Sequence, residues 1–554
     1  MYKKFVAVFL IVCLQIIAVI FFQKSYRLFQ LQPTEVAALP IQQTGVLVPL
    51  DNRPPCLLFP VQLARLGSLQ LQHPDITLMG NYQTKGQTEK IQTWLYDNTT
   101  NQAGISIVST DMLVHGGLVA SREAYTATPN QAATLELFAR LHKQYPQLFQ
   151  SAFAIIPRLT IAENNQTSPW QWHMREYTVL QDIVNTFDNP IAFKKWQSFD
   201  KVIPAELKAK YQQLYAQNNN FNQLLIQEFD AGILNSVTIG QDDAAAFGLP
   251  NHNLHSAERY LPDNSNLAQV TRGADEISQL LVAQYLNLQA GYQPRVFVQY
   301  SQADTGYKIM PYMSCSVQET VEEKVAISGG QLVDAPHQAD FILYVHCGDN
   351  SDTVVSLLSA ALSVKKLLNS GQKVALVDLS RNFRSQDTLL PYLVMLDAPL
   401  PQLIAYTGWN TTSNSIGTAV AQAAIFTLQN QQLADNLKPS LYLANLEFTL
   451  ARFIDDWGYQ KNIQHETNYN LLSRDRNPYM LGSQTKITED IITKQLLKVS
   501  KQLLYLNISR HAFFQSANKR YFVTQITPLA TLPWQRTFEI QLQLNTAVST
   551  QKID

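Results

Sequence analysis

Two adjacent carboxylates, Asp242 and Asp243, follow a short apolar segment at residues 235–240. Two neighbouring carboxyl groups cannot both ionise at low cost in a partly dry pocket. One of them is therefore expected to have a raised pKa and to hold a proton near neutral pH, so that the pair could act as acid and base. The alternative interpretation is structural, because acidic residues after a strand commonly form a turn and cap the next helix.

The segment before this pair is one of eight short apolar runs, most of them followed by helix-like sequence. Continuous apolar runs are typical of parallel strands that are buried on both faces. The runs lie at residues 45–50, 105–109, 152–156, 236–240, 295–300, 341–345, 374–377 and 403–407. Eight is the number of strands in a (β/α)₈ barrel, so we expect an α/β, barrel-like domain over residues 45–430. A doubly wound open parallel sheet is the alternative, and a ninth candidate strand at residues 76–79 would change the count.

Two regions do not fit a simple strand–helix alternation. Residues 158–235 are too long for one crossover and contain Trp170, Trp172 and Trp196, which predicts a helical insertion beside the mouth of the barrel. After residue 430, longer helical segments precede an alternating segment at residues 536–544, which is typical of an exposed strand. We therefore expect residues 431–554 to form a smaller C-terminal α+β domain.

The N-terminus carries a membrane signal. Residues 5–22 are almost wholly apolar, follow two lysines and are about long enough to span a bilayer. No small-residue cleavage site follows directly, which favours an uncleaved signal anchor at residues 1–28 and a linker at residues 29–44. We expect a cell-membrane protein with one N-terminal anchor and an extracytoplasmic domain, or a secreted protein if the segment is cleaved.

Composition limits the class of partner. Lysine and arginine (42) nearly balance aspartate and glutamate (43), and there is no basic stripe, so the sequence does not predict a nucleic-acid partner. Charged residues make up only 15% of the chain, which suits a glycan or another neutral polar substrate. Cys13 lies within the apolar N-terminal run. The remaining cysteines, Cys56, Cys315 and Cys347, are scattered and odd in number, so neither a disulfide framework nor a zinc site is predicted, and no cofactor is expected.

Polar side chains follow each predicted strand, where a barrel builds its site. Each has a structural alternative as a strand stop or helix cap, but together they have the composition of a sugar site, with Trp409 or Tyr307 as a platform for a sugar ring. With Asp242 and Asp243 as the catalytic pair, the candidate substrate-binding residues are Asp51, Arg53, Asp111, His115, Arg122, Arg158, Gln241, Asp304, Asp378, Trp409, Asn410 and Asn414.

Two glycine-containing segments have two interpretations each. In residues 406–418 (YTGWNTTSNSIGT), Asn410 and Asn414 are spaced to reach one ligand, or Asn414 caps a helix that begins near Ile416. The turn formed by His115, Gly116 and Gly117 could present backbone N–H groups to an anion, or it could simply start a helix.

Five ordered motifs resemble an uncharacterised bacterial family, the domain of unknown function 4127. They are VPLDNRP, STDMLVHGGLVASR, IGQDDAAAFG, TRGADE and YTGWNTTSNSIGT. The resemblance covers roughly residues 45–550 and implies no established activity.

A looser resemblance is to barrel glycosidases that act on 2-acetamido sugars. In that family an adjacent acidic pair after the fourth strand is followed late in the barrel by a tryptophan-asparagine segment. The resemblance implies that Asp242 orients and activates the acetamido group of the substrate, while Asp243 donates a proton to the leaving oxygen. Adjacent carboxylates favour retention of configuration with assistance from the substrate.

Three hypotheses follow from the sequence. The first is an extracytoplasmic glycoside hydrolase acting on cell-wall or surface glycans, with Asp242 and Asp243 as its acid/base pair. The second is a metal-dependent hydrolase, although no HxH or HExxH spacing supports it; its ligands would be Asp51, Asp111, His115, His346 and Asp378. The third is a non-catalytic protein that binds glycans or organises the cell envelope.

Overall fold

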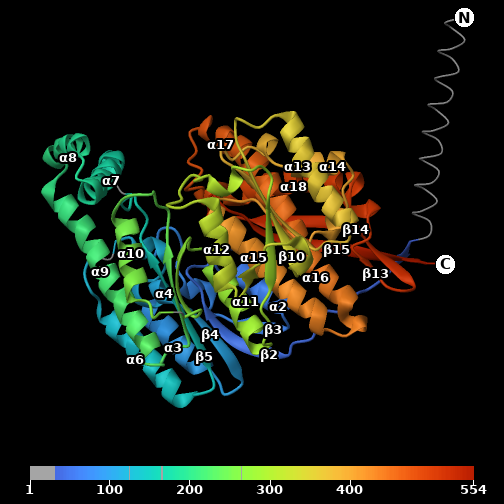
Figure 1. Cartoon of the computed structure of the whole chain (residues 1–554), viewed down its shortest axis with the longest axis horizontal. Helices are drawn as coiled ribbons and strands as arrows, with labels where there is room; N and C mark the ends of the chain where they lie inside the picture. The colour runs from blue at the N-terminus through green and yellow to red at the C-terminus, as the bar shows by residue number, and fades with distance from the viewer. Residues whose placement is uncertain (1–30, 124, 164–165, 264, 554) are drawn as a thin grey trace, which may run out of the picture.

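The computed structural model describes residues 31–553 except residues 124, 164–165 and 264. It is a mixed α/β protein with two parallel sheets, one antiparallel sheet and many helices (Figure 1). Within the described residues no helix is both long and apolar enough to cross a bilayer. The predicted signal anchor, residues 1–28, lies outside the described residues.

The first parallel sheet has the strand order β3-β2-β4-β5-β6-β7. Its inner strands are mostly buried, as their continuous apolar sequences predict, and the edge strand β3 alternates between buried and exposed residues. The strands are β2 (Gln43–Val48), β3 (Leu69–Gln72), β4 (Ala103–Ser109), β5 (Phe149–Ile156), β6 (Ser236–Gln241) and β7 (Ala268–Arg272).

The second parallel sheet has the order β12-β11-β10-β8-β9. Its strands are β8 (Arg295–Tyr300), β9 (Gln331–Leu332), β10 (Phe341–Gly348), β11 (Val374–Ser380) and β12 (Ala405–Thr407). In each of these sheets, the strand that comes second in the sequence forms one edge. The later strands are added on the opposite side of the strand that comes first. This order is typical of doubly wound open sheets.

All eight predicted strand segments are strands, but they divide equally between the two sheets. The predicted closure into one eight-stranded barrel is not seen in the described residues, because β7 forms an edge and β8 pairs with β9 and β10 instead of continuing from β7. Residues Ile76–Leu78 form a 3₁₀ turn, so the ninth candidate strand is absent; Asp75 begins this turn by accepting the Thr77 backbone N–H at 2.8 Å.

Helices surround both sheets, and α15 (Thr412–Gln432) lies in the core. All of its residues from Thr412 to Gln429 are buried. It packs against helices of both halves of the molecule, one half containing the first parallel sheet and the other half containing the second. The other helices of the two halves are α2 (Leu58–Leu66), α3 (Thr88–Asn98), α4 (Thr110–His115), α5 (Leu118–Ser121), α6 (Pro129–Gln144), α10 (Leu249–Tyr260), α11 (Ile277–Gln289), α12 (Val317–Ile327), α13 (Val354–Asn369) and α14 (Leu390–Met395).

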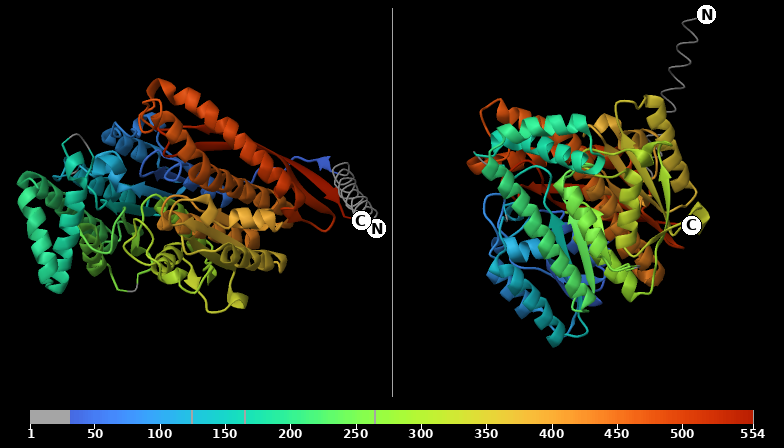
Figure 2. Two further views of the ribbon diagram at one scale, coloured as in Figure 1. Left: turned by 90° about the horizontal axis from the view of Figure 1, so that it is seen from above. Right: turned by 60° about the vertical axis from the view of Figure 1, so that its left-hand side comes forward.

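The predicted helical insertion is present as α7 (Gln171–Phe187), α8 (Pro190–Val202) and α9 (Ala205–Asp230). These helices lie at one end of the molecule, and the antiparallel sheet lies toward the other end (Figure 2). Helix α9 packs against β5 and β6, and α7 and α8 pack mainly against each other. The insertion is therefore attached to the first sheet through α9.

The C-terminal region does not have a core of its own. It consists of α16 (Lys438–Arg452), a π-helix η8 (Phe453–Ile463), α17 (Gln464–Leu472), α18 (Thr485–Leu506), β13 (Phe514–Gln515), β14 (Lys519–Thr531) and β15 (Gln541–Lys552). Alternate residues of β11 divide between two clusters: Ala375 and Val377 join the core of the first sheet, whereas Val374 and Leu376 pack with residues of α18, β14 and β15. The second sheet thus shares a core with the C-terminal region.

Two predicted boundaries differ from the observed ones. The strand predicted at residues 536–544 begins only at Gln541, because Arg536 and Glu539 form an ion pair at 2.7 Å within the turn that precedes it. Part of the predicted linker at residues 29–44 is ordered in a sheet. Strand β1 (Gln32–Pro33) pairs with β15, and β2 begins at Gln43.

A buried ion pair joins α12 to the turn before α11. The Lys324 Nζ and Glu276 Oε1 atoms are 2.6 Å apart, both side chains are fully buried, and Lys324 also donates to Thr271 Oγ1 at 2.6 Å. Helix α15 approaches this pair so closely that a Cβ on Gly417 would lie 2.3 Å from Glu276 Cγ.

We expect Lys324→Met to lower the free energy of unfolding by about 3–5 kcal/mol, because it leaves the Glu276 carboxylate unpaired in the core. Urea denaturation followed by tryptophan fluorescence measures this change. The double variant Lys324→Met/Glu276→Leu should recover most of the loss. A single variant as stable as the original protein would show that the ion pair does not hold this interface.

Candidate functional site

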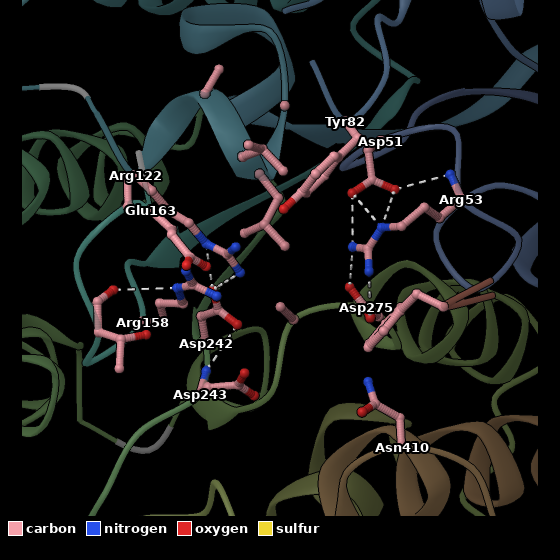
Figure 3. A pocket seen from close by; sticks show the side chains of 18 of the residues that line it. Asp51, Arg53, Tyr82, Arg122, Arg158, Glu163, Asp242, Asp243, Asp275 and Asn410 are labelled. Carbon is pink, nitrogen blue, oxygen red and sulfur yellow. Dashed lines mark hydrogen bonds and ion pairs between the residues drawn. The ribbon is translucent and has the colours of Figure 1, made fainter. Parts of the chain in front are cut away.

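A cavity of about 1420 Å³ opens at the carboxyl ends of the first sheet. Loops after β2, β4, β5, β6 and β7 form one side, while the loop after β12, the π-helix η8 and the turn before β15 contribute the other. Figure 3 shows side chains from both sides directed into this space. The cavity therefore lies between the two halves of the molecule, at the sheet edge where doubly wound folds bind ligands.

The acidic pair lies at the end of β6. The Asp242 backbone N–H donates to the Ile156 carbonyl at 3.1 Å, which continues the pairing of β6 with β5. The Asp242 carboxylate accepts Arg122 Nη2 at 2.6 Å and Nε at 3.1 Å through one oxygen. Its other oxygen accepts the Asp243 backbone N–H at 2.8 Å. The Asp242 carboxylate is therefore held in one orientation.

The two carboxyl groups have opposite pKa shifts. Burial alone would raise the pKa of Asp242, but the charges of Arg122 and Arg158 bring it below its ordinary value. Burial and the negative charge of Asp242 raise the pKa of Asp243 to about 7. Below about pH 7 the pair therefore holds mainly one ionised and one protonated carboxyl group, which is the division that their adjacency predicts.

A second charged group lies across the cavity from the acidic pair (Figure 3). Arg53 forms ion pairs of 2.7 Å with both Asp51 and Asp275, and all three side chains are buried. The Arg53 guanidinium also lies 5.3 Å from the centre of the Trp534 ring. Because two carboxylates already bind it, Arg53 serves mainly to fix Asp51 and Asp275 in the cavity wall.

An aromatic wall flanks this group. The Arg536 guanidinium lies 4.6 Å from the Tyr82 ring centre and 4.5 Å from that of Trp534, and the two rings are 6.2 Å apart. Sequence reasoning gave no role to Tyr82, Asp275, Trp534 or Arg536. Asp275 stands in the TRGADE motif after the missed strand β7, whereas nothing in the sequence places Trp534 near Arg53.

The structure brings most of the predicted site residues to this cavity. Burial lowers the pKa of His115 to about 4, so its imidazole is neutral at pH 7. The predicted residues that line the cavity are Asp51, Arg53, His115, Arg122, Arg158, Gln241, Asp242, Asp243, Trp409, Asn410 and Asn414.

Three of the predicted binding residues do not line this cavity. Asp111 is buried below the cavity, where it accepts the Ile155 backbone N–H at 2.9 Å, and burial raises its pKa to about 7. Asp378 accepts the backbone N–H groups of Leu389 and Leu390. Asp304 is exposed after β8, as is Tyr307, one of the two platform candidates. Asp378, which lies within β11, thus has a structural task in the second half of the molecule.

The segment after β12 is fixed by the π-helix. Asp456 accepts the Gly408 backbone N–H at 2.9 Å, and Lys461 donates to the Gly408 carbonyl. Asn410 then takes a left-handed conformation (φ 48°), which asparagine tolerates better than most residues. Trp409 is only 5% exposed, so it presents little ring surface to a ligand.

Asn414 does not cap a helix that begins near Ile416, because α15 already begins at Thr412 with Thr411 as its N-cap. Its side-chain amide instead donates to Asp275 Oδ2 at 3.5 Å.

The turn formed by His115, Gly116 and Gly117 is a helix boundary. Gly116 ends α4 with φ 88°, and the N–H groups of Gly116 and Gly117 both donate to the Asp111 carbonyl at 3.1 Å. These groups are therefore engaged within the turn.

The five residues proposed as metal ligands do not converge. His346 is buried in the second sheet, where its ring nitrogens lie 2.9 Å from Ser301 Oγ and 2.8 Å from the Asp387 carbonyl. Among the described residues, no group of three or more histidine, cysteine, aspartate or glutamate side chains is arranged to hold a metal ion.

The three cysteines of the described residues, Cys56, Cys315 and Cys347, are buried free thiols.

The fold and cavity define an α/β protein with two parallel sheets and a charged cavity between its two halves. Residues 45–543 match the model of a family described as protein of unknown function (DUF4127), and the chain belongs to this family. No curated protein and no solved structure matches the chain. The looser resemblance to barrel glycosidases therefore receives no support from these comparisons.

The raised pKa of Asp243 predicts a pH-dependent stability. The folded protein holds the Asp243 proton up to about pH 7, whereas an unperturbed aspartate loses it near pH 3.8. Between these values the folded state binds more protons, so the contribution of Asp243 to stability falls as pH rises. Asp243→Asn removes this titration, and the melting temperature of the variant relative to the original protein should rise from pH 5 to pH 8.

Thermal unfolding of both proteins at each pH measures the effect. The buried carboxyl groups Asp111 and Asp455, whose pKa values are also raised to about 7, are present in both and cancel in the comparison. Asp304→Asn changes an exposed aspartate and is the matched control. An equal pH dependence in the Asp243→Asn variant and the original protein would contradict the assignment.

Proposed function

We propose that the protein is an extracytoplasmic carbohydrate-active hydrolase, in which Asp243 protonates the glycosidic oxygen and Asp242 orients the substrate. The feature that carries this proposal is the position of two adjacent carboxyl groups, whose pKa values are shifted in opposite directions, in the wall of a large polar cavity. Glycoside hydrolysis needs a protonated carboxyl at the leaving oxygen and a second group that stabilises the positive charge developing on the sugar.

Asp243 is suited to the role of general acid. Its side chain is half-buried, and no hydrogen bond to its carboxyl oxygens is found among the described residues. Its proton is thus free to be donated as the bond between the anomeric carbon and the leaving oxygen breaks. After the leaving group departs, the Asp243 carboxylate can accept a proton from the attacking water, which restores the starting state.

Asp242 is suited to orienting the substrate. Arg122 and the Asp243 backbone N–H hold its carboxylate in place, and the positive charges beside it keep it ionised. Such a carboxylate can accept the N–H of a 2-acetamido group, so that the acetamido oxygen attacks the anomeric carbon. This substrate-assisted route suits neighbouring aspartates, because an inverting pair needs carboxyl groups far enough apart to hold a water between them.

The wall around the pair fits a glycan. Asn410 and Gln241 provide amide groups, Asp51 and Asp275 provide carboxylates, and the Tyr82 ring is 37% exposed. Carboxylates and amides bind sugar hydroxyl groups, while an aromatic face packs against the C–H face of a sugar ring.

Replacement of the pair separates the two roles. We expect Asp243→Asn to lower kcat by about 10²–10⁴-fold on substrates with poor leaving groups, because the general acid is lost. It should cost much less on aryl 2-acetamido glycosides, whose leaving groups need little protonation. Asp242→Asn should reduce turnover of both classes. Hydrolysis of aryl glycosides and cell-wall fragments by the purified protein measures these effects.

Asp304→Asn is the control, because this carboxylate is exposed and lies outside the cavity. For the original protein, kcat/KM should fall as pH rises above about 7, where Asp243 loses its proton. Unchanged activity in both pair variants would exclude the mechanism. Glycan binding that survives both substitutions, without turnover of any substrate, would instead favour a non-catalytic binding protein.

A further inference from the structure

Arg158 differs from the other arginines of the cavity. Arg53, Arg122, Arg175, Arg272 and Arg536 each form an ion pair with a carboxylate. Arg158 donates through Nε to the Thr160 carbonyl at 3.2 Å, and no ion pair of its guanidinium is found in the described part of the chain. Its terminal amino groups are therefore free to bind a ligand.

The position of Arg158 is set by the first sheet. It follows β5 by two residues, and the last residue of β5, Ile156, is in register with Gln241 of β6. Figure 3 shows the guanidinium groups of Arg122 and Arg158 close together beside Asp242. Asp242 thus provides one negative charge for two guanidinium groups, and Asp243 adds none while it is protonated.

The remaining acid near these arginines does not remove the imbalance. Glu163 lies alongside Arg122 in Figure 3, but its side chain is exposed to solvent, and it forms no ion pair with either arginine among the described residues. A solvent-screened carboxylate contributes little to neutralising a partly buried cation. The surplus positive charge therefore faces the cavity.

We propose that the substrate carries an oxyanion, a carboxylate or a phosphate, and that Arg158 binds it together with Arg122. The inference rests on the proposed function, since it places the anion on the sugar at or next to the bond that Asp243 protonates. The planar guanidinium fork matches two oxygens of either group. The substrate class is then an acidic glycan instead of the neutral one that the overall composition suggests.

Binding of three monosaccharides tests the proposal, with glucuronate as the carboxylate, glucose 6-phosphate as the phosphate and glucose as the neutral reference. We expect isothermal titration calorimetry to show at least one acidic sugar binding at least tenfold more tightly than glucose. Preference for glucuronate or for the phosphate identifies which oxyanion the site takes. Equal binding of all three sugars would overturn the proposal.

Arg158→Gln should abolish the preference for the acidic sugar, and Arg158→Lys should keep part of it, because lysine keeps the charge but not the fork. Arg175→Gln is the matched control: it makes the same change in a cavity arginine that pairs with Glu176. Circular dichroism verifies that each variant is folded. A full preference in folded Arg158→Gln protein would contradict the assignment of Arg158.

The same measurements distinguish this inference from the proposed function. Asp243→Asn cannot protonate a leaving group but keeps both arginines, so it should still prefer the acidic sugar. If it does, and the original protein hydrolyses no glycan, the anion site stands and the hydrolase proposal fails. If the original protein hydrolyses acidic and neutral glycans equally well, and Arg158→Gln does not change this, the hydrolase proposal stands and the anion site fails.

Discussion

Helix α15 has no solvent-facing side from Thr412 to Gln429, and this enclosure sets the relative position of the two parallel sheets. It contacts α2 and α11 of the first half, and α12, β11 and β12 of the second. In its first turn, the Asn414 side-chain amide donates a hydrogen bond to Asp275 in the cavity wall. The cavity thus depends on packing in the core. A change in the tilt of α15 would move one wall against the other, and the close approach of Gly417 to Glu276 opposes such a change.

The sequence predicted the strands better than their arrangement. Each of the eight apolar runs is a strand, because burial on both faces leaves a local composition that can be recognised. Which strand pairs with which depends on contacts between distant segments. The prediction of a barrel was wrong because three strands were missed. Buried and exposed residues alternate in β3, β7 (AQVTR) is half polar, and β9 has only two residues. These strands form three of the four edges of the two parallel sheets, and the edges are what distinguish two open sheets from one barrel.

For the site, the rule that chemistry lies after strand ends found the residues of the first sheet, including Asp51, Arg122 and Asp242. It failed where a polar residue has a local task, as Asp378 does: this residue lies within β11 and accepts the backbone N–H groups at the start of α14. It could not find Trp534 or Arg536, which reach the cavity from a turn near the C-terminus. Their contribution depends on tertiary packing alone. The ionisation of the acidic pair was predictable because adjacency itself creates the repulsion.

The pairing of β1 with β15 has a mechanical consequence. Gln32 lies opposite Thr550, and the Thr34 N–H donates to the Val548 carbonyl at 3.0 Å, so the chain near residue 31 is fastened to the edge of the antiparallel sheet. Tension applied to the chain there would load the hydrogen bonds between β1 and β15 first. It would then pass into β14 and the core shared with α18. While the pairing of β1 with β15 holds, such a force enters the antiparallel sheet before it reaches β2, which begins at Gln43 in the first sheet.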